Sequence, residues 1–375
     1  MADRFSRRWI IGIGVFVWSI MATACGLARS ATQLFWARVG VGVGEAALSP
    51  AAYSMLTDLF PREKQGGAFS IYNMGITIGS GLALLIGGLV VAAVSGEGKT
   101  FVLPLLGEVR AWQMAFIITG LPGVLLPLLL LSVREPVRRG LLKKTDARGI
   151  ESTHRPSFFE LLKFVGKNVD FYSLHFVAMA LLSLVGYGVG AWLPSTLVRT
   201  YGITAGHAGI MIGTFTLVIN TAGLFFAGKL SDHLTKKGRT DAAVIVCFLS
   251  ACGIATLTAI PALMPNITMM WVALAVSCFT FHGYVAMGPM IVNQVTPNQM
   301  RALVSALYLF VVNMIGMMGG PVIVPLITRL LFNDESQIRY GLSITIAVGG
   351  TLAAVLLWIE RSKYKKKMLA AAAWQ

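Results

Sequence analysis

The chain has 375 residues, of which 56% are hydrophobic and 13% are charged, whereas about 25% of the residues of a soluble domain are charged. This composition excludes a soluble globular protein and indicates one that crosses a membrane several times. A net charge of +15 would suggest nucleic-acid binding in a soluble protein, but here the basic residues collect between apolar segments, so we expect no nucleic-acid partner.

Ten apolar segments are long enough to cross a bilayer as helices, and none alternates like a transmembrane β-strand. They are residues 9–28, 31–57, 66–94, 112–133, 171–198, 207–228, 242–264, 267–294, 302–328 and 340–359. Most of the 31 Lys and Arg residues lie in alternate connections, and cytoplasmic loops carry such an excess. The sequence therefore predicts a multi-pass protein of the inner (plasma) membrane with both termini in the cytoplasm.

The longest connection divides these spans into two groups. Residues 1–133 are expected to form a partial N-terminal bundle of four helices, 134–170 a basic cytoplasmic linker, and 171–375 a C-terminal bundle of six helices with a basic tail. At the end of the linker, residues 157–168 place apolar and basic side chains on opposite faces of a helix. This pattern predicts an amphipathic helix in the membrane interface, with partner binding as the alternative.

Arg38 and Glu45 are the only charged residues inside any of the ten spans. A charge near the bilayer centre costs at least about 2.5–3.5 kcal/mol, so intramembrane charges are usually functional. The two residues lie two helical turns apart and share a face, with an axial separation of roughly 10 Å. Gly40 and Gly44 between them have the spacing that lets a neighbouring helix approach closely. We predict that Arg38 and Glu45 face a cavity and carry ion-coupling or substrate chemistry; the structural alternative is a snorkelling Arg and a neutral or paired Glu.

Other polar residues inside the spans are candidates for lining the same cavity: Asn73, Tyr187, Asn220, His282, Asn293 and Asn313. A single intramembrane histidine such as His282 is more often held by structural hydrogen bonds than used as a proton relay. His175 begins a span and is expected at the interface.

The sequence gives no reason to expect a metal, a cofactor or an enzymatic reaction. All four cysteines lie inside spans without metal-ligand spacing, which favours apolar packing over a metal site or a disulfide. SGEGKT (95–100) lacks the first glycine of a phosphate-binding loop, so we exclude ATP-driven transport by this chain.

Several motifs resemble the major facilitator superfamily. ADRFSRR (2–8) resembles the end of that family's signature turn, GKLSDHLTKK (228–237) its second copy, and ARVGVGVGEA (37–46) its fourth-helix element. Two further stretches, GVGEAALSPAAYSMLTDLFP and PNQMRALVSALYLFVVNMIGMMGGP, resemble the spinster branch, especially its bacterial members. The resemblance implies an all-α polytopic membrane protein with about 10 (4 + 6) of the 12 helices expected for the major facilitator fold, the family's first two being absent.

The resemblance also implies roles for individual residues. Glu45 would take up a proton and thereby release Arg38 to hold an anionic or zwitterionic head group. A cytoplasmic gate would use a carboxylate that faces the N-terminal end of a helix in the other bundle. The implied gate residues are Asp3, Arg4, Arg7, Arg8, Asp232 and Lys236. The alternative for these basic turns is simple positive-inside topology.

As a whole, the resemblance implies a monomeric secondary active transporter in the lipid bilayer. It would be coupled to protons, work by alternating access and move an amphipathic lysolipid-like or small organic solute. An organic-anion (sugar-acid type) proton symporter is the alternative, because that group has a similar R…GEA…P pattern. Since the family's first two helices are absent, a non-transporting membrane receptor or scaffold is a third hypothesis.

Overall fold

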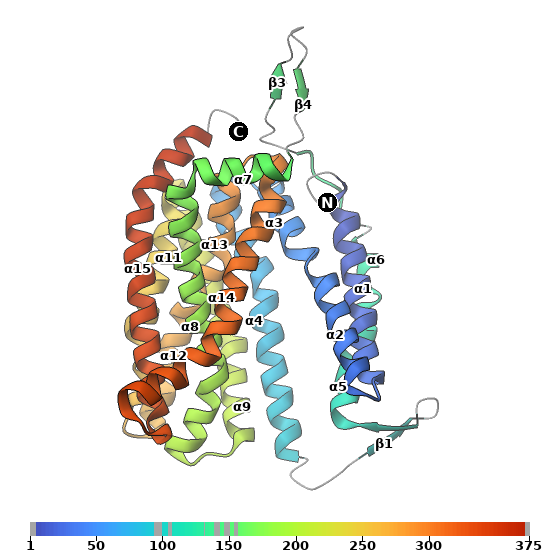
Figure 1. Cartoon of the computed structure of the whole chain (residues 1–375), viewed down its shortest axis with the longest axis vertical. Helices are drawn as coiled ribbons and strands as arrows, with labels where there is room; N and C mark the ends of the chain where they lie inside the picture. The colour runs from blue at the N-terminus through green and yellow to red at the C-terminus, as the bar shows by residue number, and fades with distance from the viewer. Residues whose placement is uncertain are drawn as a thin grey trace.

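The computed structural model describes residues 5–93, 100–103, 107–130, 132–138, 143–145, 151–153 and 157–371. In these residues long helices lie side by side, and two short antiparallel hairpins project from opposite ends of the helix assembly (Figure 1). The helices are α1 Arg7–Leu27, α2 Ala31–Glu45, α3 Leu48–Leu59, α4 Arg62–Ala93, α5 Ala111–Gly123, α6 Leu126–Leu130, α7 Phe158–Lys167, α8 Val169–Tyr201, α9 Ala205–Phe215, α10 Thr221–Lys236, α11 Ala242–Gly253, α12 Ile267–Phe281, α13 Gly283–Gln294, α14 Asn298–Phe332 and α15 Ile338–Ala371.

The hairpins and short turns complete the described elements. β1 (Thr100–Leu103) pairs with β2 (Gly107–Arg110), and β3 (Lys143–Thr145) pairs with β4 (Glu151–Thr153). Two π-helical turns, η1 (Thr216–Asn220) and η2 (Ile254–Thr258), interrupt long helices, and η3 (Pro261–Leu263) and η4 (Glu335–Gln337) are 3₁₀ turns.

The helices confirm the predicted all-α membrane fold. Eight helical segments of the described residues are long and apolar enough to cross a membrane. They are Arg7–Leu27, Arg62–Ile86, Val169–Tyr201, Ala205–Lys236, Ala242–Leu263, Ile267–Gln294, Asn298–Phe332 and Glu335–Ala371. The other two expected spans are each divided between two shorter helices, α2 with α3 and α5 with α6.

The break between α2 and α3 lies where one continuous helix was expected. Pro50 explains it, because a proline inside a helix clashes with the carbonyl four residues earlier and donates no hydrogen bond. That carbonyl belongs to Ala46, and the helix stops at Glu45 and restarts at Leu48. The break therefore places Glu45 at the end of α2, near the middle of the predicted span.

Glycines bring α2 against α1, as the Gly40–Gly44 spacing predicts. A Cβ on Gly44 would lie 2.7 Å from the Trp18 backbone nitrogen and 2.8 Å from the Gly14 carbonyl oxygen. A Cβ on Gly40 would lie 2.6 Å from the Met21 side chain. One face of α2 is thus fixed against α1, and its opposite face points away from α1.

Helix α4 packs on the C-terminal helices, although it precedes the linker in sequence. Its closest contacts are with α9 and α10, where a Cβ on Gly66 would lie 2.7 Å from the Gly228 carbonyl oxygen. Further along the same contact, the hydroxyls of Thr77 and Thr221 are 2.8 Å apart. The main hydrophobic core lies among the C-terminal helices and extends to Phe69 of α4.

Helix α7 lies across one end of the long helices (Figure 1). Ser157 and Glu160 form a capping box at its start. Leu161 is buried, while Phe159 is 80% exposed. We call this end of the molecule the basic end, because the start of α1 and the Lys-rich end of α15 lie there (Figure 1); the sequence predicts it to be cytoplasmic.

We expect Gly44→Ala to lower the free energy of unfolding by about 1–3 kcal/mol, because the new methyl group has no space against the α1 backbone. Gly42→Ala is the matched control, since a Cβ there meets nothing within 4 Å. Thermal unfolding of both variants in detergent micelles measures the difference. Equal unfolding temperatures for the two variants would contradict the close packing of α1 and α2.

Candidate functional site

The basic end is closed by an ion-pair network centred on Asp58, a fully buried residue in the last turn of α3. Its Oδ2 lies 2.6 Å from Nη1 of Arg7 on α1, and its Oδ1 lies 2.8 Å from Nη1 of Arg301 on α14. Asn298 donates from Nδ2 to both carboxylate oxygens at 2.9 Å. Because Asn298 begins α14, the carboxylate faces the positive end of that helix. Asp58 thus joins α1 and α3 to the C-terminal half.

Glu135 from the linker supplies a second carboxylate to this network. Its Oε1 lies 3.0 Å from Nε of Arg7, and its Oε2 accepts hydrogen bonds from the Ser6 hydroxyl at 2.8 Å and from the backbone N–H of Arg8 at 3.0 Å. Partial burial alone would raise the pKa of Glu135, but the hydrogen bonds from Arg8, Ser6 and Arg7 outweigh it and lower that pKa to about 2. The carboxylate is therefore charged at any physiological pH.

A chain of buried amides crosses between α4 and the C-terminal helices at the same level. Gln294 of α13 donates from Nε2 to Oε1 of Gln65 at 2.8 Å, and the Tyr364 hydroxyl of α15 donates to Oε1 of Gln294. Gln65 in turn donates to the carbonyls of Thr57 and Phe60, both at 3.2 Å. These bonds tie the loop after α3 to the C-terminal half.

The predicted gate residues do not all lie in one place. Arg7 is at the centre of the Asp58 network, and Arg8 lies beside it, bonded to the Val133 carbonyl at 3.2 Å. Asp232 instead contacts α4, where its Oδ2 accepts the Gly67 N–H at 2.9 Å. Asp3 and Arg4 are outside the described residues. The gating role of these residues stays a prediction.

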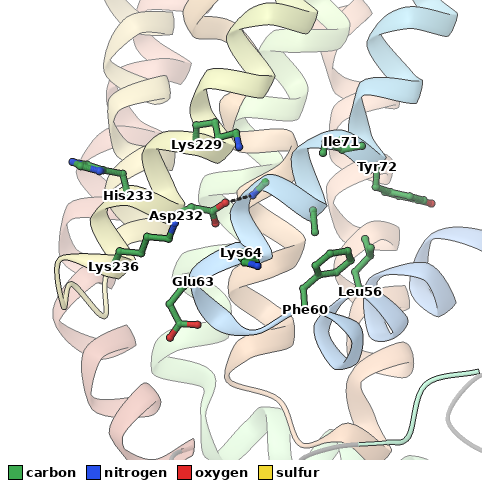
Figure 2. Close-up of a pocket in the computed structure, with 12 residues that line it drawn as sticks. Leu56, Phe60, Glu63, Lys64, Ile71, Tyr72, Lys229, Asp232, His233 and Lys236 are labelled. Carbon is green, nitrogen blue, oxygen red and sulfur yellow. Dashed lines mark hydrogen bonds between the residues drawn. The ribbon is translucent and has the colours of Figure 1, made fainter.

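A pocket of about 720 Å³ opens at the basic end between α3, α4 and α10 (Figure 2). Its apolar lining includes Leu56, Phe60, Ile71 and Tyr72. Its charged or titratable lining is Glu63, Lys64, Lys229, Asp232, His233 and Lys236. Figure 2 shows these two groups on different sides of the pocket. Lys236, a predicted gate residue, is thus a pocket residue in this structure.

Arg38 and Glu45 are both exposed and do not line this pocket. With about 3.6 residues per turn, they lie on the face of α2 opposite Gly40 and Gly44, away from α1. The Arg38 guanidinium lies 5.9 Å from the ring centre of Phe116 on α5. Glu45 is close enough to interact electrostatically with the hydroxyls of Tyr72 on α4 and Tyr187 on α8. Glu45 therefore faces the C-terminal half.

The six polar candidates divide into two groups. Tyr187 and Asn313 are exposed, and the Tyr187 hydroxyl donates to Oδ1 of Asn313 at 3.5 Å. Tyr187 lies on the surface that Glu45 faces, and Asn313 is hydrogen-bonded to Tyr187. This is where the structure brings predicted site residues from both halves together.

The other candidates are buried or half-buried within the helix packing. Asn73 accepts from the Tyr53 hydroxyl at 3.2 Å, and Asn293 donates to the Ser305 hydroxyl at 2.9 Å. Asn220 is buried in the π-helical turn η1, and His282 is half-buried between α12 and α13. In this conformation Asn73 and Asn293 stabilise packing and do not line an open cavity.

His175, which the sequence leads us to expect at the membrane interface, is buried inside the protein. Its ring is fully buried, with Nδ1 2.9 Å from Oε1 of the buried Glu360 and Nε2 3.0 Å from the Gly288 carbonyl oxygen. The ring is buried because α15 continues as a helix well past the apolar segment and covers this position.

Sequence reasoning missed Asp58 and Arg301 because both lie just outside the apolar spans. One signal was present: Asp58 directly follows the span that ends at residue 57, and Arg301 directly precedes the span that begins at residue 302. That complementary charge could have suggested contact between the halves.

Comparison with known proteins identifies relatives over nearly the whole chain. The Major Facilitator Superfamily family model matches residues 1–321 and 199–373. The chain is 25% identical to an MFS-type efflux pump of Mycolicibacterium smegmatis, over 98% of this chain and 80% of the pump. It is 23% identical to a probable L-galactonate transporter of Escherichia coli, over 95% and 76% of the two chains. It is 26% identical to the sphingosine-1-phosphate transporter SPNS2 of Danio rerio, over 68% and 49%.

A solved structure supports the fold. A bacterial homologue of the human lysosomal transporter spinster, in an inward-facing conformation, aligns with a TM-score of 0.56 and 24% identity. The alignment covers 100% of this chain and 84% of that one.

We expect Asp58→Asn to destabilise the protein by about 3–5 kcal/mol, because it removes the buried carboxylate that the guanidinium groups of Arg7 and Arg301 share. Asp170→Asn is the control: Asp170 also faces two cations, Lys363 and Lys367, but its side chain is 45% exposed. Thermal unfolding of the purified variants compares them. The network would lose its structural importance if Asp58→Asn unfolded at the temperature of Asp170→Asn.

The contact between Glu135 and the start of α1 should survive moderate acid. The pKa of Glu135 is lowered, so its stabilising contribution is present above the ordinary value near 4.5 and is lost as the pH falls toward about 2. Protease cleavage of the linker should therefore proceed at equal rates at pH 7 and pH 5 and faster in Glu135→Gln at both values, measured with a protease active at both. A parent protein whose linker is cleaved much faster at pH 5 would contradict this assignment.

Proposed function

The chain belongs to the major facilitator superfamily, and from that premise we propose that it is a proton-coupled transporter whose coupling site is Arg38 and Glu45 of α2. It is a secondary transporter of the membrane and not an enzyme, and spinster-like proteins are among its relatives. We place it in the plasma membrane as a monomer with both termini in the cytoplasm, as the distribution of basic residues suggests.

The position of Glu45 is the observation that carries this proposal. Glu45 lies near the middle of a predicted span, is exposed, and interacts electrostatically with Tyr187 from the other half. A carboxyl group in this place can exchange a proton with a water-filled space between the halves. Its contact with both halves makes its charge sensitive to their relative position.

A proton on Glu45 changes what Arg38 can bind. At roughly 10 Å and an effective dielectric constant of about 20, the two charges attract by about 1.7 kcal/mol. An anion bound at Arg38 is repelled by a charged Glu45 to a similar extent, so neutralising Glu45 corresponds to more than a tenfold gain in the affinity of Arg38 for that anion. The direction of the effect couples proton uptake to anion binding.

The break between α2 and α3 suits this chemistry. Broken helices occur at membrane depth where the free backbone groups line a cavity rather than face lipid. Here the break directly follows Glu45, so carbonyls near the coupling carboxyl lack regular helical partners. They are available to water or to a polar group of the substrate.

The Asp58 network can open without leaving a bare buried charge. If the halves separate at the basic end, Asp58 keeps Arg7, which lies in its own half. Arg301 keeps the carbonyls of Asn293 and Thr296, to which its Nε donates at 3.1 Å. Separation therefore breaks the Asp58–Arg301 ion pair and the Asn298 hydrogen bonds, but it leaves both charged groups with partners. This arrangement suits a reversible gate in alternating access.

We propose an amphipathic, lipid-like solute with an anionic head group as the substrate. The sphingosine-1-phosphate transporter of Danio rerio supports a phosphate-bearing amphiphile. The galactonate transporter of Escherichia coli favours the second candidate, a sugar-acid proton symporter. Arg38 suits either head group, because a guanidinium binds phosphate and carboxylate with two parallel hydrogen bonds. A scaffold without transport has no comparable support, since these relatives are named as transporters.

Transport across a vesicle membrane with an imposed pH gradient tests both candidates. We expect Glu45→Gln to reduce proton-driven movement of sphingosine-1-phosphate, or of galactonate, at least tenfold, and Arg38→Ala to weaken binding of the same solute. Glu335→Gln is the control, because Glu335 is an exposed acid outside the bundle.

The choice of solute decides between the two substrate classes. Movement of galactonate with no effect of single-chain amphiphiles would replace the lipid proposal with the sugar-acid one. If Glu45→Gln and Arg38→Ala both moved either solute like the parent, the coupling site would lie elsewhere.

A further inference from the structure

The pocket at the basic end has the composition of a site for a lipid head group with part of its acyl chain. Its volume of about 720 Å³ lies within the range of ligand pockets, about 300–1,000 Å³. Its charged residues and its apolar residues lie on different sides (Figure 2). Arg38 and Glu45 are not part of it, so it is separate from the proposed coupling site.

Three lysines provide the cationic side. Lys64 comes from the first turn of α4, and Lys229 and Lys236 come from α10; all three are exposed. Within the described part of the chain, none of them forms a salt bridge within 4 Å, although Lys229 and Lys236 interact electrostatically with Asp232 and Lys229 lies over the Phe225 ring. Their charges are therefore available to a ligand.

The two acids of the pocket are turned elsewhere. Asp232 directs its carboxylate to the α4 backbone, where Oδ2 accepts the Gly67 N–H at 2.9 Å. Figure 2 shows Glu63 pointing away from the apolar residues Ile71 and Tyr72. His233 is exposed at the rim. Asp232 still interacts electrostatically with Lys229 and Lys236, but the three lysines outnumber the two acids of the lining, so an anion that approaches along the apolar side meets a net positive charge.

The pocket lies at the ends of the predicted spans, which is the level of the head-group region of a bilayer. The lysines border the apolar segments: the predicted spans begin at residue 66 in α4 and end at residue 228 in α10. Within the predicted span of α4, Ile71 of the pocket lining is 62% exposed. A head group at the lysines would leave its acyl chain along this side chain.

We propose that this pocket binds an anionic phospholipid of the surrounding leaflet, with its phosphate at Lys64, Lys229 and Lys236 and one acyl chain along Ile71 and Tyr72. The lipid connects α4 to α10, and these helices belong to different halves of the sequence. It therefore stabilises the conformation in which the basic end is closed. Because a cytoplasmic leaflet is negatively charged, the sequence-predicted orientation places the pocket where such lipids are available.

Binding of dioleoyl phosphatidylglycerol to the purified full chain in detergent tests the proposal without a transport assay. We expect this lipid to raise the unfolding temperature in a saturable way, and dioleoyl phosphatidylcholine at the same concentration to raise it far less. Each lysine near a charged lipid contributes about 1 kcal/mol, so Lys64→Gln, Lys229→Gln and Lys236→Gln together should weaken half-saturation by about 100-fold. Lys237→Gln is the matched control, because Lys237 is adjacent and exposed but does not line the pocket.

Three results would overturn the proposal. Equal stabilisation by phosphatidylcholine would show that the phosphate charge is not selected, and an equal loss of binding in Lys237→Gln would show general surface attraction. Full stabilisation by inorganic phosphate alone would show an anion site without a lipid. Mass spectrometry of lipid that co-purifies with the parent and the triple variant gives an independent readout: retention of phosphatidylglycerol by both would also contradict the assignment.

Discussion

The cost of burying charge determines how the two halves of this protein meet. Asp58 is fully buried, and it is acceptable there only because Arg7, Arg301 and Asn298 surround its two oxygens. Two of these partners come from α14 and one from α1, so the carboxylate can be satisfied fully only when the halves are together. Since each arginine has further partners in its own half, the same arrangement can also separate. A closed but reversible contact follows from the hydrogen-bonding needs of one carboxylate.

Close approach between helix backbones determines how α2 packs on α1 and how α4 packs on α10. Gly40 and Gly44 seat α2 on α1, and Gly66 and Gly228 seat α4 on α10. Small residues are needed here because helices in a bilayer gain little from burying apolar side chains and depend on tight contact instead. Because one face of α2 packs against α1, the face that carries Arg38 and Glu45 points toward α4 and α8. The placement of Glu45 opposite Tyr187 is thus a consequence of where the glycines are.

The charged residues of the chain serve distinct purposes. Those around Asp58 are buried, paired and bind the halves together, whereas Arg38 and Glu45 are exposed within a predicted span. The lysines at the pocket are exposed at the membrane edge, where an anionic lipid is the natural counter-charge. Burial and depth, more than residue type, distinguish the Asp58 network, the proposed coupling site and the proposed lipid site.

The sequence by itself determined the membrane class, the helical spans and the family, because length, hydropathy and short motifs are local properties. It also picked out Arg38 and Glu45, since an intramembrane charge is costly wherever the chain folds. Asp58, Arg301 and Gln65 escaped notice, because each lies just outside an apolar span and looks like an ordinary loop residue, and Gln294 did so because it is the last residue of a span. The burial of His175 with Glu360, residues from opposite ends of the C-terminal half, likewise depended on which helices are neighbours. Only the tertiary structure decided these pairings, because the free energy of a buried polar group is set by partners far away in the chain.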